Sequence, residues 1–389
     1  MRITLVVHAL EPGGSTAFAD QLTRSFRAAG DEVSVVAGAA SSLSEAPRHE
    51  VVPAFRRRCD RAFAYRETVL RTKPDVVYAL SGLEEFDMLR MVDIPRARHI
   101  FSLEKFLFTD IQWIIRRCSE WVELFTANTP DVLEAIGSAS PSSQRCLAPY
   151  QIASDWFDVP QIQRDSRIVN ICFVGRFERH QKRAHWLPAI VEGCENAGLS
   201  LCWNFFGAGE LDGSIRRRIE TTLPSGRVIF HGWVSQDQLR SRLSEIDLFL
   251  LCSRWEGLPI AMVEAMAAGV SPIAPDIPGG MRYAVGSEQA GWLYEASSPK
   301  QAIAQLVAIA RNRPAIEIRR AAARRFAHSK FSPEVTSGQF AQLREALESL
   351  KFNGRALSPQ APRLPTASFT QRFAARLHGS TSLKRLLSL

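Results

Sequence analysis

Residues 247–270 read DLFLLCSRWEGLPIAMVEAMAAGV, and this stretch decides the fold of the second half of the chain. Residues 247–252 are almost all apolar, which is typical of a strand buried on both faces of a parallel sheet. Pro259 suits the first turn of a following helix, and Gly269 suits its end. Residues 254–258 are therefore predicted to form a loop at the carboxyl end of a parallel strand, where open α/β sheets bind ligands. The free N–H groups at the start of the helix favour a phosphate.

The rest of the chain repeats this alternation of apolar runs and helical patterns, once before and once after a polar segment around Pro160. Strands and helices that alternate at this spacing predict parallel sheets with helices on both faces. The predicted strands are residues 3–7, 33–37, 75–80, 98–101 and 124–127, then 169–174, 201–206, 228–230, 247–252 and 270–274.

The predicted organisation is an α/β protein with two Rossmann-like domains. The first domain comprises residues 1–160 and the second residues 161–335. A closing helix follows at residues 336–352, and residues 353–389 form a Pro-containing linker and a basic tail.

Two carboxylates in the opening stretch, Glu256 and Glu264, are separated by seven residues. Such a pair is common in helical proteins, so one interpretation is a solvent-exposed loop acid and a helix-surface acid. Glu264, however, lies within the apolar run AMVEAM at residues 261–266, where an unpaired charge would be unfavourable. The alternative interpretation is that Glu264 binds a ligand.

The stretch SRWEGLPIAMVEAMAAG at residues 253–269 resembles the signature of the retaining glycosyltransferases of family 4, also called group 1. The family pattern has a Glu, seven residues and a second Glu, with Gly-Leu-Pro after the first and Glu-Ala-Met-Ala-x-Gly from the second, and all of it is present. The resemblance extends over roughly residues 1–350. It implies the GT-B fold, in which the parallel sheets of an acceptor-side domain and a nucleotide-sugar donor domain face each other across a cleft.

The resemblance also implies roles for the residues of the signature. Glu264 is expected to hydrogen-bond the ribose hydroxyls of the donor, and Glu256 is expected to contact hydroxyls of the donor sugar. The backbone of Gly257 and Leu258 is expected to approach the sugar and the diphosphate.

The segment FVGRFERHQKR, which begins at Phe173, resembles the family's strand, Gly-Arg turn and nearby lysine. Arg176 and Lys182 are predicted to bind the diphosphate, because this leaving group gains negative charge as the glycosidic bond breaks. The Arg-to-Lys spacing is one residue longer than the commonest family form, so Arg179 or Arg183 could share the role. A solvent-exposed basic turn is the alternative.

Glycines recur in the loops that the resemblance assigns to the donor. FFGAGE and HGWV resemble two segments for which it implies backbone contacts to the base and ribose, and Trp233 could stack on a base or belong to the core. EPGGS, after the first strand, would present N–H groups to the donor phosphate or the acceptor, unless it is a plain turn. Gly279 and Gly280 suit close backbone approach in the segment DIPGGMRYAV, which resembles the loop that closes the donor site. The further donor-contacting residues so implied are Gly13, Gly14, Gly175, Gly207, Gly209, Trp233 and Val234.

The acceptor side departs from the family pattern. Many members carry a His at the end of the strand that corresponds to residues 99–103, and this chain has Ser102, Leu103 and Glu104 there. Glu104 could substitute, as could His8 at the end of the first strand, and either could instead be structural.

The implied reaction is transfer of a hexose, with anomeric retention, from a UDP- or GDP-linked donor to a glycan or lipid-linked acceptor in cell-envelope polysaccharide synthesis. The catalytic candidates are Arg176, Lys182, Glu256 and Glu104. No cluster of metal ligands stands beside the predicted diphosphate site, so turnover is expected to require neither a metal nor another cofactor. The alternatives are a catalytically silent scaffold that binds a nucleotide sugar, and a sugar-nucleotide epimerase of the same two-domain shape.

Charge and cysteine usage restrict the partners. Six of the eight net positive charges lie in residues 353–389, so the main body is nearly neutral and nucleic-acid binding is not indicated. Seven cysteines without a CxxC pair argue against a zinc site and a disulfide framework. The chain also lacks an apolar run of membrane-spanning length and a signal-peptide pattern, which predicts a cytoplasmic protein.

The tail suggests a peripheral location on the inner face of the plasma membrane. Residues 353–389 contain no Asp or Glu, and Phe369, Phe373 and Leu377 recur at four-residue spacing between arginines. Basic residues beside an apolar stripe suit an anionic membrane surface. A disordered soluble tail is the alternative.

Overall fold

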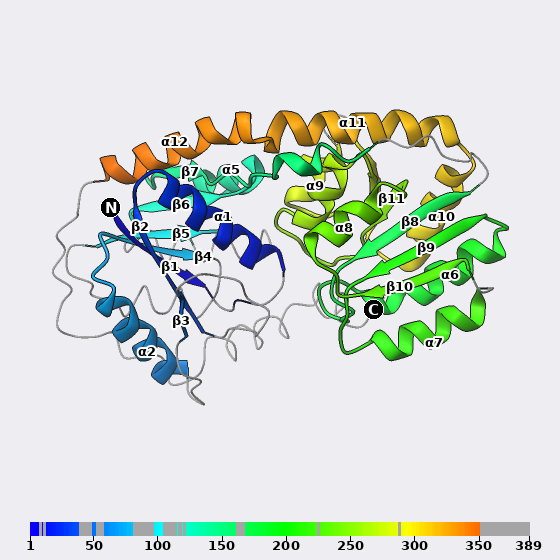
Figure 1. Ribbon diagram of the computed structural model, residues 1–389, viewed down its shortest axis with the longest axis horizontal. Helices are drawn as coiled ribbons and strands as arrows, with labels where there is room; N and C mark the ends of the chain where they lie inside the picture. Colours follow the sequence, from blue (N-terminus) through cyan, green and yellow to red (C-terminus); the bar gives the residue numbers. More distant parts are fainter. Residues whose placement is uncertain are drawn as a thin grey trace.

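The computed structural model describes the parts of the chain that form two parallel sheets and the helices around them (Figure 1). The described residues are 1–7, 10, 13–38, 49–51, 58–80, 97–103, 115, 119, 122–160, 168–223, 226–286 and 289–350.

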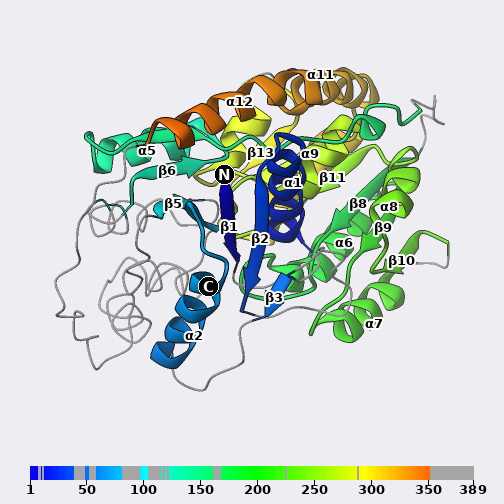
Figure 2. The same ribbon diagram turned by 60° about the vertical axis from the view of Figure 1, so that its left-hand side comes forward.

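The first sheet has seven parallel strands in the order β3-β2-β1-β4-β5-β6-β7. Its strands are β1 (Arg2–Val7), β2 (Glu32–Ala37), β3 (His49–Val51), β4 (Val76–Leu80), β5 (Arg98–Ser102), β6 (Leu124–Ala127) and β7 (Arg145–Leu147). The helices described around it are α1 (Gly14–Ala28), α2 (Arg58–Arg71) and α5 (Pro130–Ala139). Figure 2 shows α1 lying beside β1 and β2.

Both faces of the first sheet are covered, as its continuous apolar strands require. Ile3 and Leu5 pack in one buried apolar cluster with Phe18 and Leu22 of α1. Val6, which points to the other face, packs in a second cluster with side chains of α2 and α5.

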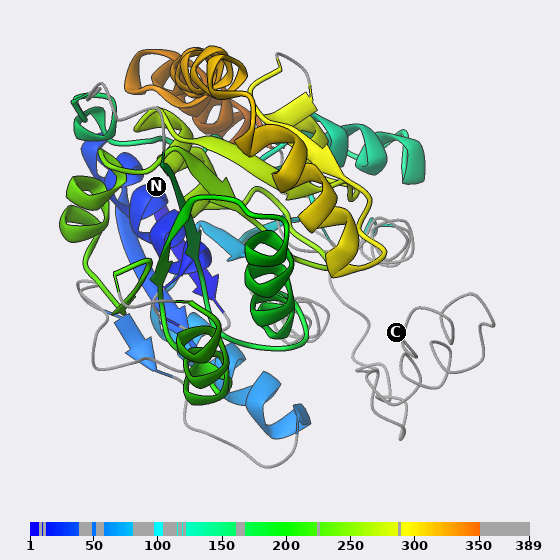
Figure 3. The same cartoon turned by 90° about the vertical axis from the view of Figure 1, so that its right-hand side faces the viewer.

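The second sheet has six parallel strands in the order β10-β9-β8-β11-β12-β13. They are β8 (Val169–Val174), β9 (Leu201–Phe206), β10 (Val228–Gly232), β11 (Leu248–Leu250), β12 (Ser271–Pro275) and β13 (Trp292–Tyr294). The α-helices around this sheet are α6 (Leu187–Asn196), α7 (Asp212–Thr222), α8 (Gln236–Leu243), α9 (Ile260–Ala267) and α10 (Pro299–Ala310). Short 3-10 helices are η1 (Ser154–Trp156) and η2 (Ala184–Trp186), and a π-helical turn, η3, spans Arg282–Gly286. Figure 3 shows α6, α7 and α10 side by side on one face of the sheet.

The strands predicted from long apolar runs are confirmed, although β11 spans only Leu248–Leu250 of the predicted 247–252. The three strands that the sequence analysis did not predict, β3, β7 and β13, have only three residues each. Pro259 is not within the first turn of α9 as predicted but immediately precedes it, with φ −75° and ψ 93°. Gly269 follows the end of α9 with φ +78°, the left-handed conformation expected after a helix.

Two long helices run along both domains (Figure 1). Helix α11 (Arg313–Phe331) packs on α9 of the second domain, and α12 (Pro333–Ser349) continues over the first domain. Arg344 of α12 forms an ion pair of 3.0 Å with buried Asp31. The chain passes between the domains once near Ile152 and again at the end of α11. The backbone N–H of Ile152 donates to the Phe331 carbonyl, so these two connecting segments lie side by side. No helix in the described segments is long and apolar enough to cross a membrane.

The strand orders define two topological switch points. In the second sheet the order reverses between β8 and β11, and in the first between β1 and β4. Ligands of open α/β sheets bind outside the carboxyl ends of the strands at such points. A ligand-binding site is therefore expected at the loops after β8 and β11.

Candidate functional site

The loops after β8 and β11 bring together three of the predicted residues, Arg176, Lys182 and Glu256. The backbone N–H of Arg254 donates to the Gln181 carbonyl over 2.7 Å, which joins the two loops directly. The second domain thus presents cations and a carboxylate together at its switch point.

Glu256 is the centre of this group. One of its carboxylate oxygens, Oε1, accepts a hydrogen bond from the Lys182 ammonium over 2.5 Å and another from the Ser253 hydroxyl over 2.6 Å. Only 8% of Glu256 is exposed, so the acid is not a solvated loop residue. A buried carboxylate needs such partners, and removal of one of them leaves an uncompensated charge.

Gln181 connects Arg176 to this group, and the sequence analysis did not predict its role. The Gln181 amide donates to the Trp255 carbonyl over 3.3 Å and to Oε2 of Glu256 over 3.4 Å. Its Oε1 accepts from the Arg176 guanidinium over 3.1 Å. Arg176 and Lys182 therefore approach the same carboxylate, one through Gln181 and the other directly.

The turn that carries Lys182 is held by Glu178. The Glu178 carboxylate accepts from the backbone N–H groups of His180, Gln181 and Lys182. Burial opposes ionisation of Glu178, but these backbone bonds outweigh it and lower the pKa of the carboxyl. This acid fixes the turn through backbone contacts that residue spacing does not reveal.

Arg183, the cation next to Lys182, makes its contacts away from this group. Arg183 is buried, donates to the Ala296 carbonyl over 2.9 Å and lies 4.5 Å above the Trp186 ring. Burial, with help from nearby Arg254, lowers the pKa of Arg183. Arg183 therefore packs within the second domain, whereas Arg179 is exposed to solvent.

Glu264 is buried within α9 and is not a helix-surface acid. Its Oε1 accepts a hydrogen bond of 2.9 Å from the phenol O–H of Tyr150, a residue of the segment that leaves the first domain. Burial raises the pKa of Glu264 to about 7, although the Tyr150 hydrogen bond acts in the opposite direction. The carboxyl thus titrates near neutral pH.

The predicted glycines lie where two backbones approach closely. Gly207 has φ +115°, and a Cβ there would overlap the Gly175 carbonyl group. A Cβ on Gly209 would lie 2.6 Å from the Phe177 carbonyl oxygen. The loop after β9 therefore packs directly on the loop that carries Arg176, and only glycine permits this packing.

The loop of Gly279 and Gly280 packs on the signature in the same way. The Gly280 N–H donates to the Gly257 carbonyl over 3.0 Å, and a Cβ on Gly280 would overlap that carbonyl and lie 2.9 Å from the Leu258 Cα. Leu258 is buried in the core, so this backbone cannot move aside easily.

Gly280→Ala is therefore expected to lower the free energy of unfolding by about 1–3 kcal/mol, the usual effect of overpacking. Gly338→Ala is the matched control, because Gly338 is exposed within α12 and a Cβ there meets nothing within 4 Å. This control should gain about 0.5–1 kcal/mol. Urea unfolding measures both, and equal stability of the two variants would contradict the packing described.

Trp233 is 55% exposed and does not belong to the core, and its stacking on a base stays a prediction. It follows His231, whose ring stacks on Phe206 with centroids 4.2 Å apart and whose Nε2 lies 3.0 Å from the Asn204 Oδ1. Val234 is partly buried and packs against the core.

The glycine loop of the first domain reaches the start of α9. Gly13 precedes α1, and a Cβ on Gly14 would lie 3.2 Å from Cδ1 of Ile260, the first residue of α9. Helices α1 and α9, from different domains, therefore begin next to each other. N–H groups of both helix starts can face one anionic ligand.

The acceptor side is described only in part. Ser102 and Leu103 are both buried. Glu104 and His8, the two candidates for an acceptor-side polar group, lie outside the described residues.

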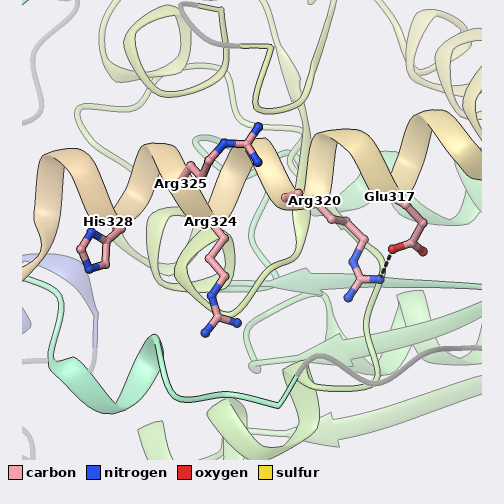
Figure 4. A pocket seen from close by; sticks show the side chains of 6 residues that line it. Glu317, Arg320, Arg324, Arg325 and His328 are labelled. Carbon is pink, nitrogen blue, oxygen red and sulfur yellow. Dashed lines mark hydrogen bonds and ion pairs between the residues drawn. The ribbon is translucent and has the colours of Figure 1, made fainter.

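A separate hollow lies along α11 and contains none of the predicted site residues (Figure 4). It is lined by Glu317, Arg320, Ala321, Arg324, Arg325 and His328. Arg320 donates to the Gly269 carbonyl, and Arg324 donates to the carbonyls of Phe157 and Val159, so these arginines connect α11 to other parts of the fold. Across the described segments, no group of three or more His, Cys, Asp or Glu could hold a metal ion.

Two Rossmann-like domains with a carboxylate-and-cation group at the switch point of the second define a protein of the GT-B fold. Residues 155–326 match the family described as glycosyl transferases group 1.

The curated relatives match shorter parts of the chain. An uncharacterized 41.2 kDa protein in the cps region of Klebsiella pneumoniae is 30% identical over 117 residues, which are 30% of each chain. The putative colanic acid biosynthesis glycosyltransferase WcaL of Escherichia coli K12 is 25% identical over 173 residues, 41% of this chain and 42% of WcaL. A GDP-mannose:cellobiosyl-diphosphopolyprenol alpha-mannosyltransferase of Xanthomonas oryzae is 49% identical over 55 residues, 14% of each chain. This chain therefore spans less than half the length of these relatives.

Solved structures resemble the whole described fold. HepE of Anabaena in complex with UDP and glucose has a TM-score of 0.71 at 15% identity, covering 89% of this chain and 100% of HepE. Sucrose-phosphate synthase of Thermosynechococcus elongatus has a TM-score of 0.70 at 17% identity, covering 90% of this chain and 100% of that enzyme. At such identities the likeness establishes the GT-B fold and nothing more.

Proposed function

We propose that the chain transfers a hexose from a UDP- or GDP-linked donor to a hydroxyl of a glycan or lipid-linked acceptor, with retention of the anomeric configuration. The observation that carries the proposal is the contact between Lys182 and buried Glu256 at the switch point of the second sheet. Arg176 is joined to this contact through Gln181.

In the proposed reaction, the bond between the anomeric carbon and the diphosphate oxygen breaks, and its electron pair stays on the diphosphate. Lys182 and Arg176 stabilise this developing charge. The acceptor oxygen bonds to the anomeric carbon from the side of the leaving group, and its proton passes to a diphosphate oxygen. Glu256 binds hydroxyls of the transferred sugar, and Glu264 binds the ribose.

The names of the relatives support the proposed substrate class. WcaL is named for colanic acid biosynthesis, and the Xanthomonas protein is named for transfer from GDP-mannose to cellobiosyl-diphosphopolyprenol. We therefore propose polysaccharide synthesis as the process and a saccharide on a lipid diphosphate as the acceptor class. The domain division, the cytoplasmic location and the membrane role of the tail remain predictions, and residues 353–389 lie outside the described residues.

The proposal is tested by incubating the full chain with radiolabelled UDP- and GDP-hexoses and a bacterial lipid extract. Label should enter the lipid fraction while nucleoside diphosphate is released, and NMR of the product should show the anomeric configuration of the donor. Donor binding without diphosphate release would favour the silent scaffold. An altered sugar that stays on its nucleotide would favour an epimerase.

Transfer is expected to continue in EDTA, because Lys182 and Arg176 supply the positive charge that a metal ion supplies in other transferases. The measurement is the transfer rate with EDTA and again after Mn²⁺ is added. Loss of transfer in EDTA and recovery with Mn²⁺ would contradict the proposed role of the two cations.

A further inference from the structure

Tyr150 is held by the first domain while its hydroxyl reaches the second. The Gln21 side chain of α1 donates to the Pro149 carbonyl over 3.0 Å and accepts from the Gln151 N–H over 2.9 Å, so it holds the residues on both sides of Tyr150. The Tyr150 ring also packs on Phe18 of α1, with ring centroids 6.5 Å apart. These contacts fix the ring relative to the first domain.

The phenol group of Tyr150 contacts one oxygen of Glu264 and leaves the other unoccupied. Its O–H donates to Oε1 over 2.9 Å. Oε2 has no hydrogen-bond partner in the described part of the chain. It also is not among the buried atoms that solvent cannot reach. The carboxylate is thus fixed at Oε1 while Oε2 remains open to a ligand hydroxyl.

We propose that Tyr150 is a positioning residue that orients the Glu264 carboxylate, from the other domain, toward the ribose of the donor. This inference rests on the proposed donor-binding role of Glu264. It adds a residue that lies 114 positions from its partner and outside the signature.

The same hydrogen bond favours the ionised form of Glu264, which is the stronger acceptor. The pKa of Glu264 is raised to about 7, and burial is the largest cause. The Tyr150 hydrogen bond acts to lower this pKa, and the Asp155 charge acts to raise it. Burial and Glu264 also raise the pKa of Tyr150 well above its ordinary value, so the phenol keeps its proton. Without the phenol, the carboxyl would stay protonated to higher pH.

Among the described residues, Arg24 and Asp155 are the other charges that act on this pair. Arg24 of α1 slightly favours ionisation of Tyr150, and Asp155 in η1 is paired with Arg240 of α8. On α11, which packs against α9, Arg320 donates to the Gly269 carbonyl and to Glu317, and Arg324 donates to the carbonyls of Phe157 and Val159. β12, also in contact with α9, carries no charged side chain.

The test is isothermal titration of the full chain with UDP and with GDP between pH 5.5 and 8.5. In the wild type, affinity for the preferred nucleotide should rise with pH through about 7, because ionised Glu264 accepts the ribose hydroxyls more strongly. Tyr150→Phe should move this rise to higher pH and weaken binding at pH 7 by about tenfold, the effect of losing a bond to a charged group. Glu264→Gln should remove the rise through about pH 7 and leave only the pH dependence of the nucleotide's terminal phosphate, whose second pKa is about 6.

Tyr78→Phe is the matched control, because it removes another buried phenol, bonded to Thr126 over 2.8 Å in the first sheet. Its nucleotide affinity should equal that of the wild type at every pH. An unchanged pH profile in Tyr150→Phe would overturn the inference.

A second measurement does not require nucleotide binding. Carboxyl-carbon NMR of labelled glutamates, with Glu264→Gln for assignment, reports the Glu264 titration directly. A higher midpoint in Tyr150→Phe supports the inference, and an unchanged midpoint overturns it. Failure of the wild type to bind either nucleotide would instead contradict the proposed function, so the two failures are distinguishable.

Discussion

Lys182→Met is expected to lower the rate of sugar transfer by about 10²–10³-fold, the usual effect of removing one preorganised group that stabilises a developing oxyanion. Methionine keeps most of the apolar stem of lysine but cannot donate to Glu256 or to the leaving diphosphate. The expected loss is mainly in kcat, because the charge on the diphosphate develops as the bond breaks. Single-turnover transfer at saturating donor measures this loss.

Arg179→Ala is the control, because Arg179 lies in the same turn, carries the same charge and is exposed. Its transfer rate should stay close to that of the wild type. If Arg179→Ala lost as much rate as Lys182→Met, the turn would act through its general charge and not through the Lys182 contact. The melting temperature of each variant must accompany the rates, since Lys182→Met leaves Glu256 without its cation.

Asp247→Ala is expected to lower the free energy of unfolding by about 3–5 kcal/mol, because it removes the fully buried partner of Arg313 and Arg320, whose remaining partner, Glu317, is half exposed. Asp247 is completely buried at the start of β11. Its two oxygens accept from both terminal nitrogens of Arg313 over 2.8 Å and from the Asn170 N–H over 2.8 Å, and Arg320 lies 3.7 Å away. This carboxylate therefore joins α11 to two central strands of the second sheet.

Glu220→Ala is the control for Asp247→Ala, because it removes an exposed ion pair of 3.8 Å with Arg216 on α7. Such surface pairs contribute about 0–1 kcal/mol. Urea unfolding of both variants is the measurement. A loss below 1 kcal/mol in Asp247→Ala would show that the buried pairs contribute little to the stability of the second domain.

The strands that could be predicted from the sequence are those formed by continuous apolar runs. Strands such as β1 and β8 are buried on both faces, so their residues are apolar without interruption. β3, β7 and β13 are three-residue strands at or near sheet edges, and such short runs carry too little pattern to distinguish them from loops.

The site was predictable where its residues lie in local motifs and not where its contacts join distant segments. Glu256 and Lys182 were found from two motifs, and the structure places them in contact. Gln181 was missed because its amide acts across two loops. Tyr150 was missed because its role depends on the packing of one domain against the other, which no residue spacing expresses.

The most direct test of the central claim, that the second domain binds a nucleotide sugar through the signature carboxylates, is a thermal-shift comparison of the wild type and Glu264→Ala against UDP- and GDP-hexoses. A ligand at 100 times its dissociation constant adds about 2.7 kcal/mol to the stability of a folded protein. At least one donor should raise the melting temperature of the wild type, and Glu264→Ala should lose this shift. A donor that stabilises both proteins equally, or a panel in which no donor stabilises the wild type, would contradict the claim.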